Sequence, residues 1–348
     1  MLLRLPFTLS SALLSPPLHP HRSKPFSSLS SSPNPNPNPN PNHRSNTTLP
    51  LFLRPLSYSA PVSSLLSFRL WAESLALSSV DDPRLLRELS WLIDDASAHK
   101  HPRNDSLVPL RVELHELYEL WRERIEKRRP FQYLVGCEHW RDLVLGVREG
   151  VLIPRPETEM VVDLVGEVEG FERGWWADLG TGSGALAIGI GRMLREDGRV
   201  FATDLSSDAV EVARFNVERY GLKDKVEIRQ GSWFEPLQDV KGKLAGIVSN
   251  PPYIPTSHLP GLQPEVGLHE PRLALDGGEN GMDHLLHLCE GSASALKSGG
   301  FFAFETNGDA HSEFLADLMT AKWGKFFHNI KIVLDFAGIK RFVTGYRR

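Results

Sequence analysis

An alternation of short apolar strands and helices from Trp175 onward most constrains how this chain can fold. Strands are predicted at 175–179, 199–204, 225–229, 244–249 and 300–305, and the helices between them at about 184–195, 207–220 and 281–297. This rhythm indicates an α/β domain with a parallel sheet covered by helices on both faces. Two last strands, predicted at 327–336 and 340–346, are joined by too few residues for a crossover helix, so they should pair antiparallel at the sheet edge.

The region before the sheet is predicted to be a small helical domain covering residues 67–130. Apolar residues such as Leu85, Leu89 and Leu92 recur there at three- and four-residue steps, and Pro130 ends the pattern. Strand-like pieces between glycines at 131–153 predict a hairpin that bridges this domain and the sheet domain at 154–348. The sequence leaves open whether the helices contact a substrate or only pack against the sheet domain.

Residues 1–66 are predicted to be a disordered leader. Six Lys or Arg precede the first acidic residue, Glu73, in Ser- and Pro-rich sequence that includes a Pro-Asn alternation from Pro33 to Asn42. Such an acid-free leader is typical of an organelle transit peptide, and a plain disordered tail is the alternative. The serine content favours the chloroplast stroma over the mitochondrial matrix.

The composition behind the leader disfavours several classes of protein. Of the 39 Lys and Arg, 33 follow residue 72, and all 43 acidic residues do, which leaves a net charge of −10. So acidic a body is not attracted to phosphate backbones, and we expect no direct nucleic-acid partner. Cys137 and Cys289 lack metal-ligand spacing, so neither disulfides nor a metal site are expected. No apolar run is long enough to span a membrane, and we expect a monomer.

A glycine-rich turn follows the first predicted strand of the sheet, in the run WWADLGTGSG at 175–184. Glycines let the backbone pass close to a ligand, and the amides at a helix start attract electron-rich groups. The same turn fits a dinucleotide fingerprint, so an NAD-binding protein is an alternative. Acids on two successive strands favour S-adenosyl-L-methionine. The predicted cofactor-binding residues are Asp178, Gly180, Thr181, Gly182, Ser183, Gly184, Asp204, Trp233 and Asn250.

Three of these residues have individual predicted roles. Asp178 is expected to hold the ammonium group of the cofactor's methionine part, directly or through water. Asp204 suits two ribose hydroxyls because a carboxylate has two acceptor oxygens, although it could also cap the helix that follows. Trp233 offers a flat apolar face for adenine, with burial in the core as its alternative.

A second loop ends the predicted strand 244–249 abruptly with Asn250, Pro251, Pro252 and Tyr253. Two consecutive prolines fix φ and remove two donors, so this loop is stiff. It lies at the carboxyl end of a strand, where ligands bind in open α/β sheets. Taken alone, the loop is better explained as a strand-ending turn.

A proline-rich turn, Val151–Glu159, carries Arg155 and Glu157 ahead of a helix predicted from Met160 to Val168. Prolines on both sides of Arg155 make the turn rigid. Its charged side chains could contact a substrate or be solvated.

Together these motifs resemble the release-factor glutamine methyltransferases, which methylate the side-chain amide of the Gln in a Gly-Gly-Gln motif. The resemblance implies a Rossmann-like, seven-stranded class I S-adenosylmethionine-dependent methyltransferase fold with a small N-terminal helical domain, in a plant organellar member that acts on a peptide chain release factor. The matching segments are Pro130–Gly136, Val151–Glu159, Asp178–Gly184, Asp204–Ser206 with Asn216, Asn250–Pro255, Glu270–Leu275 with Gly281, and Asp335–Arg341.

The resemblance also implies how the acceptor is held. Asn250, Pro251, Pro252 and Tyr253 are the predicted catalytic and substrate-binding residues, and Arg155 and Glu157 are predicted to join them in binding the substrate. The Asn250 oxygen and the Pro251 carbonyl would accept the two N–H groups of the target amide, and Tyr253 would pack against its plane. The alternatives are methylation of an exocyclic amine of a base in RNA or DNA, and a nucleotide-binding protein that transfers no methyl group.

Overall fold

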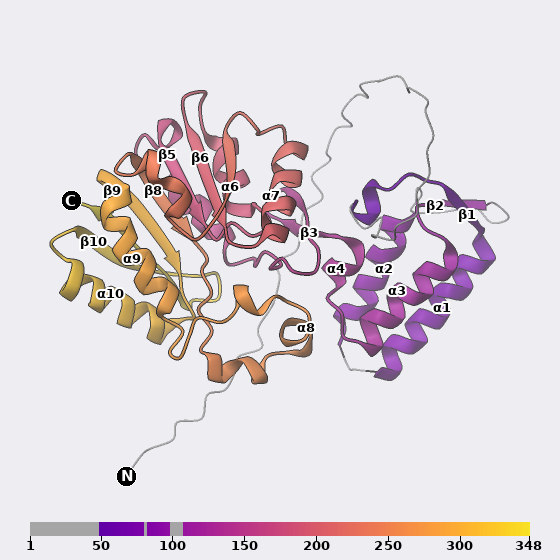
Figure 1. Cartoon of the computed structure of the whole chain (residues 1–348). Helices are drawn as coiled ribbons and strands as arrows, with labels where there is room; N and C mark the ends of the chain where they lie inside the picture. The colour runs from indigo at the N-terminus through magenta and orange to yellow at the C-terminus, as the bar shows by residue number, and fades with distance from the viewer. Residues whose placement is uncertain (1–48, 80–81, 98–106) are drawn as a thin grey trace, which may run out of the picture. The chain divides into compact units, whose positions relative to one another are not determined.

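A seven-stranded sheet carries the fold, as the sequence predicts (Figure 1). The computed structural model describes residues 49–79, 82–97 and 107–348. The strand order is β10-β11-β9-β8-β5-β6-β7, parallel from β9 to β7 and antiparallel on both sides of β11. The strands are β5 (Trp175–Leu179), β6 (Arg199–Asp204), β7 (Val226–Gln230), β8 (Leu244–Ser249), β9 (Leu296–Glu305), β10 (Phe327–Leu334) and β11 (Lys340–Arg347).

Helices cover both faces of this sheet, as Figure 1 shows. Side chains alternate along each strand, so Trp176 and Phe301 enter one core while Ala177 and Phe302 enter the other. The first core is closed by α5 (Glu159–Gly166), α6 (Ala185–Met193) and α7 (Ser207–Arg219). The second is closed by α9 (Asp283–Ala295) and α10 (Asp309–Trp323).

Two features of the C-terminal part differ from the prediction. No helix is predicted from the sequence between β9 and β10, where the structure has α10 (Asp309–Trp323). The last two strands do pair antiparallel, but β11 lies inside the sheet between β9 and β10, and only β10 is at the edge. Because β11 pairs with strands on both sides, its residues Phe342 and Val343 are fully buried.

The pairing of β5 with β8 depends on a glycine. Gly246 lies opposite Trp176 on β5 and Phe301 on β9. A Cβ at Gly246 would lie 2.0 Å from the Trp176 ring, so any side chain there would displace the indole. Trp176 is fully buried and meets Phe301 edge to face at 6.3 Å. These aromatic rings therefore fix how β5, β8 and β9 lie against one another.

The N-terminal part of the described chain is mainly helical and has its own core. Leu51 and Leu65 are buried there, so part of the segment 49–66, which the prediction assigned to the leader, is structured; residues 1–48 lie outside the described residues. The high Ser and Pro content of this segment obscured its apolar contacts. The elements are η1 (Leu51–Leu53), β1 (Tyr58–Pro61), α1 (Val62–Ser79), α2 (Arg84–Ala96), β2 (Leu107–Leu110) and α3 (Leu114–Glu126), with β1 and β2 paired antiparallel.

A short helix and a hairpin connect this part to the sheet. Helix α4 (Phe131–Val135) occupies the start of the predicted hairpin region, and the hairpin itself is β3 (Cys137–Trp140) with β4 (Leu143–Gly146). The remaining short elements are η2 (Phe171–Arg173), η3 (Glu235–Val240), η4 (Thr256–Gly261), α8 (Pro264–Gly267) and η5 (Arg272–Ala274). Three of them, η4, α8 and η5, follow the Asn250 loop.

Among residues 49–79, 82–97 and 107–348, no helix is both long and apolar enough to cross a membrane. Over the same residues, no group of three or more His, Cys, Asp or Glu side chains is arranged to hold a metal ion. Cys137 and Cys289 are buried free thiols.

Candidate functional site

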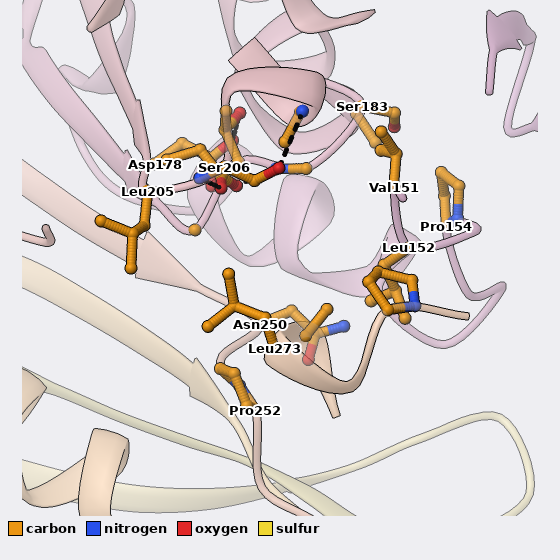
Figure 2. Close-up of a pocket in the computed structure, with 18 of the residues that line it drawn as sticks. Val151, Leu152, Pro154, Asp178, Ser183, Leu205, Ser206, Asn250, Pro252 and Leu273 are labelled. Atoms are coloured by element: carbon orange, nitrogen blue, oxygen red, sulfur yellow. Dashed lines mark hydrogen bonds between the residues drawn. The ribbon is translucent and has the colours of Figure 1, made fainter. Parts of the chain in front are cut away.

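A pocket opens at the carboxyl ends of three adjacent strands, β8, β5 and β6. Its walls include Asp178 on β5, Asp204 at the end of β6 and Asn250 directly after β8. Parallel strands end at the same edge of a sheet, so motifs far apart in the sequence meet there. Figure 2 shows Asn250 and Pro252 on one side of the pocket and Asp178 and Ser206 on the other.

The glycine-rich turn forms one wall of this pocket. Gly180 and Gly182 have φ of 76° and 56°, values that residues with a Cβ rarely adopt, and they line the pocket together with Thr181 and Ser183. Gly184 does not line it, although the sequence analysis predicted a cofactor contact there. A Cβ on Gly184 would be in ordinary contact with Ala213 at 3.4 Å, so the glycine is required by its φ of 85° at the start of α6.

Asp178 presents an unsatisfied acceptor to the pocket. Its Oδ2 accepts hydrogen bonds from the Thr181 hydroxyl (2.6 Å) and the Ala187 amide (3.1 Å). Its Oδ1 is buried without a partner among the described residues, and so is the hydroxyl oxygen of Ser183. Burial raises the pKa of Asp178 to about 7, even though its two hydrogen bonds lower it. Since buried polar atoms are normally paired, these two atoms indicate a ligand with a cationic donor and an acceptor.

Asp204 ties the end of β6 to the glycine turn. Its Oδ2 accepts from the Gly182 amide and its Oδ1 from the Ser206 amide, both at 2.9 Å. The helix that follows is capped by Ser206, whose hydroxyl accepts from the Ala209 amide, so Asp204 is not the cap. Burial raises the pKa of Asp204. Each of its oxygens keeps acceptor capacity for a second donor on the pocket side.

Aromatic rings form another wall of the pocket. Trp233 lines it, as predicted, and its ring lies 5.4 Å from that of His284 on α9, which also lines the pocket. Trp233 has φ of 45°, an uncommon conformation for a residue with a bulky side chain. His284 is not among the residues predicted from the sequence, because only the packing of α9 brings it to the pocket.

The Asn250 loop is held by Thr158, which itself lines the pocket. The Asn250 amide nitrogen donates to the Thr158 hydroxyl at 3.0 Å, which turns the carboxamide oxygen away from Thr158. Pro252 lines the pocket, whereas Pro251 and Tyr253 are not among its lining residues. The Tyr253 hydroxyl donates instead to Glu305 at 3.0 Å.

In the proline turn, the Arg155 guanidinium is paired with a carboxylate of the protein. Arg155 lines the pocket, but its guanidinium donates to both oxygens of Glu270, at 2.7 and 2.9 Å. Its backbone carbonyl accepts from the indole of Trp140. The side chain therefore joins the proline turn to the chain after α8, and the predicted substrate contact through Arg155 stays a prediction. Glu157 is half-buried and does not line the pocket.

Asn216 supports the glycine turn from α7. It is fully buried, and its side chain accepts from the Gly146 amide and donates to the carbonyls of Gly146 and Ser183. One carboxamide therefore joins the hairpin strand β4 to the turn that lines the pocket.

Comparison with known proteins places this site in context. The model of the methyltransferase small domain family matches residues 160–259. The release factor glutamine methyltransferase of Thermosynechococcus vestitus is 42% identical over 243 residues, 68% of this chain and 81% of that protein. That of Gloeobacter violaceus is 41% identical over 265 residues, 74% of this chain and 90% of that protein. The solved ribosomal protein L11 methylase of Lactobacillus delbrueckii subsp. bulgaricus aligns at 21% identity with a TM-score of 0.41, over 58% of this chain and 84% of that one.

Replacing Arg155 with Met should destabilise the protein in a pH-dependent way. Burial raises the pKa of Glu270, and Arg155 opposes that rise. Without the guanidinium, the pKa of Glu270 rises further. The folded variant then loses stability at about pH 8, where Glu270 would be ionised, and loses less near pH 5, where a neutral Glu270 is tolerated. We expect a loss of about 2 kcal/mol at the higher pH, because the Arg155 side chain is partly exposed, and a smaller loss at the lower pH.

Urea denaturation of wild type and variant at both pH values measures this difference. Arg192→Met is the matched control, because Arg192 pairs with Asp142 at the surface and should cost less than about 1 kcal/mol at either pH. If Arg155→Met lowered the free energy of unfolding equally at both pH values, Arg155 would not be the residue that stabilises an ionised Glu270.

Proposed function

We propose the activity of this chain from its family: the chain belongs to the release factor glutamine methyltransferase family, and its reaction is the S-adenosyl-L-methionine-dependent methylation of a glutamine side-chain amide in the Gly-Gly-Gln motif of a release factor. The observation that carries the proposal is the placement of Asn250 across one pocket from the glycine turn. That arrangement sets an amide-binding loop opposite a cofactor-binding wall.

The pocket fits S-adenosyl-L-methionine. The unpartnered oxygen of Asp178 suits the ammonium of its methionine part, and the unpartnered Ser183 hydroxyl suits the carboxylate. Asp204 would hold the ribose hydroxyls, and Trp233 with His284 would contact the adenine. When bound, the cofactor supplies an electrophilic methyl group on a sulfonium.

The residues of the chain must then orient the glutamine amide nitrogen toward the methyl group. An amide nitrogen is a poor nucleophile because its lone pair is delocalised into the carbonyl. The Asn250 oxygen and the carbonyl of the adjacent Pro251, a residue that is not itself among those lining the pocket, would accept the two N–H groups of the glutamine amide and so orient its nitrogen. The prolines keep these two acceptors rigid, and such positioning lowers a barrier by roughly 7 to 11 kcal/mol. No residue need act as a general base, since the N–H becomes strongly acidic only as the methyl transfers.

Methylation of a base amine in RNA or DNA is the second candidate, because it requires the same kind of planar amine clamp. The net charge of −10 from residue 73 onward disfavours a polyanionic substrate. The family to which the chain belongs supports the protein substrate.

We further propose that the protein is a monomer that works in an organelle, with the plastid stroma favoured over the mitochondrial matrix. Six Lys or Arg and no acid precede Glu73 in Ser-rich sequence, which is typical of transit peptides. The similar proteins of Thermosynechococcus and Gloeobacter come from cyanobacteria, the lineage from which plastids descend. The substrate would then be a release factor of the same organelle.

A methyl-transfer assay tests the reaction directly. With radiolabelled S-adenosyl-L-methionine, the purified protein should label an organellar release factor that carries Gly-Gly-Gln, and should not label the same factor with that glutamine replaced by alanine. Purified organellar RNA is the competing substrate. Labelling of the RNA and not of the factor would overturn the proposal in favour of the base amine.

Asn250→Ala should separate catalysis from cofactor binding. The variant loses one preorganised acceptor, so we expect turnover to fall about 100-fold or more. Affinity for S-adenosyl-L-methionine, measured by calorimetry, should change little. Asn280→Ala is the matched control, because Asn280 is exposed and does not line the pocket. Near-normal turnover of a folded Asn250→Ala enzyme would remove Asn250 from its role.

The leader can be tested separately from the enzyme. Residues 1–48 fused to a fluorescent protein should direct it into plastids of a plant cell. A fusion in which Arg4, Arg22, Lys24 and Arg44 are replaced by Glu should stay in the cytosol, because such leaders lack acidic residues. Fluorescence of the unaltered fusion in mitochondria or in the cytosol would contradict the plastid assignment.

A further inference from the structure

A buried carboxylate lies directly behind the Asn250 loop. Glu305 ends β9 and is 1% exposed. Its neighbour Phe304 pairs with Ser249, the residue before Asn250. Glu305 on β9 therefore lies level with Asn250, the first residue after β8. Glu305 is not among the pocket-lining residues. Its side chain therefore lies outside the wall of this pocket.

Glu305 accepts two hydrogen bonds, one on each oxygen. The Thr158 hydroxyl donates to Oε2 at 2.7 Å, and the Tyr253 hydroxyl donates to Oε1 at 3.0 Å. Thr158 in turn accepts from the Asn250 amide nitrogen at 3.0 Å. One carboxylate thus reaches the first residue of the Asn250–Tyr253 loop through Thr158 and the last residue directly.

The direction of these hydrogen bonds follows from the chemistry of the groups. An ionised carboxylate only accepts, and a threonine hydroxyl has a single proton to donate. Because Thr158 gives that proton to Glu305, it can only accept from Asn250. The Asn250 carboxamide must then present its NH₂ group to Thr158, since the reversed orientation would bring two acceptor oxygens together inside the protein.

We propose that Glu305, acting through Thr158, fixes the orientation of the Asn250 carboxamide and so makes the Asn250 oxygen the atom that meets the substrate. This inference rests on the proposed function, in which that oxygen accepts an N–H of the glutamine amide. Glu305 and Thr158 are positioning residues. A reversed carboxamide would offer donors to a substrate that has only N–H groups to give at this point, so the amide would not be held.

The second hydrogen bond holds the far end of the loop. Tyr253 is tied to the same carboxylate, and Pro251 and Pro252 between the two ends are stiff. Fixing both ends of a segment with so little backbone freedom leaves the Pro251 carbonyl no independent motion. Glu305 therefore positions both acceptors that the target amide needs.

The orientation depends on Glu305 being ionised. Burial raises the pKa of Glu305 to about 7, Glu157 raises it too, and the two hydroxyls and the guanidinium of Arg341 lower it. Arg341, on β11, is itself held by Asp335. A protonated Glu305 could donate to Thr158 and allow the carboxamide to reverse. We therefore expect kcat at saturating cofactor to fall as the pH drops through about 7.

Substitutions at Thr158 and Glu305 test the proposal through kcat. Thr158→Val keeps the shape and removes the hydroxyl, and Glu305→Gln keeps the shape and adds donors. Each should lower kcat for the release factor by about 10- to 100-fold, below the loss expected for Asn250→Ala. Calorimetric affinity for S-adenosyl-L-methionine should stay within about threefold, because neither change removes a predicted cofactor contact. Thr158→Ser restores the hydroxyl and should recover most of kcat.

Two further measurements distinguish positioning from a general loss of structure. In an Asn250→Ala background, Thr158→Val should add little further loss, since it acts through the missing side chain, and Glu305→Gln should add less than its full loss, since only its hydrogen bond to Tyr253 still matters. Glu305→Gln should also flatten the decline of kcat below about pH 7. Thr320→Val is the matched control, because the exposed Thr320 hydroxyl donates to the Ala316 carbonyl on α10, far from the loop in sequence, and its kcat should not change.

Equal kcat values for Thr158→Val and Thr158→Ser would overturn the proposal, as would full turnover in folded Glu305→Gln. Independent, multiplicative losses for Glu305→Gln and Asn250→Ala would also overturn it. If Glu305→Gln does not fold, the pair of Thr158 variants still decides. Failure of the wild-type protein to methylate any release factor is a different result, because it contradicts the proposed function itself.

Discussion

The pairing of β5 with β8 is the contact on which the rest of the structure depends. Gly246 leaves room for the ring of Trp176, so the two strands lie close and are buried on both faces. The glycine turn after β5 and the Asn250 loop after β8 therefore open into one pocket. Neither strand can shift without moving the helices that cover it, so the two loops keep a constant separation. A methyl-transfer site needs this constant separation, because its catalysis consists mainly of holding the acceptor and the methyl donor in the right relative position.

Two buried carboxylates at this edge of the sheet differ in how many of their oxygens are hydrogen-bonded by the protein. Asp178 and Glu305 are each 1% exposed, and burial raises the pKa of both to about 7. Asp178, which lines the pocket, has one oxygen without a partner among the described residues, whereas Glu305 has a donor on each oxygen and does not line the pocket. An unpaired buried acceptor costs free energy until a donor arrives, which favours binding of a cationic ligand. A fully paired carboxylate instead orders the groups around it.

The sequence predicted the strands of the sheet to within a few residues because each is a short apolar run between turn formers. It also identified the family, since the chain belongs to the release factor glutamine methyltransferases that its motifs resemble. Local sequence patterns did not predict the features that depend on contacts between residues far apart in the chain. Helix α10 was not predicted, and ordered residues at 49–66 were assigned to the leader. The pairing of Arg155 with Glu270, which is 115 residues away in the sequence, was not predicted either.

By itself, the sequence determined the fold class and which motifs line the pocket. Asp178, Asp204 and Asn250 stand at strand ends in any parallel arrangement, because side chains at the carboxyl ends of such strands gather at one edge. Only the tertiary structure decided the direction of the hydrogen bonds behind the site. Thr158 and Glu305 meet Asn250 and Tyr253 because α5, β8 and β9 pack together, and His284 reaches Trp233 because α9 packs on the other face. Such pairings follow from packing between distant segments, which no local pattern of residues records.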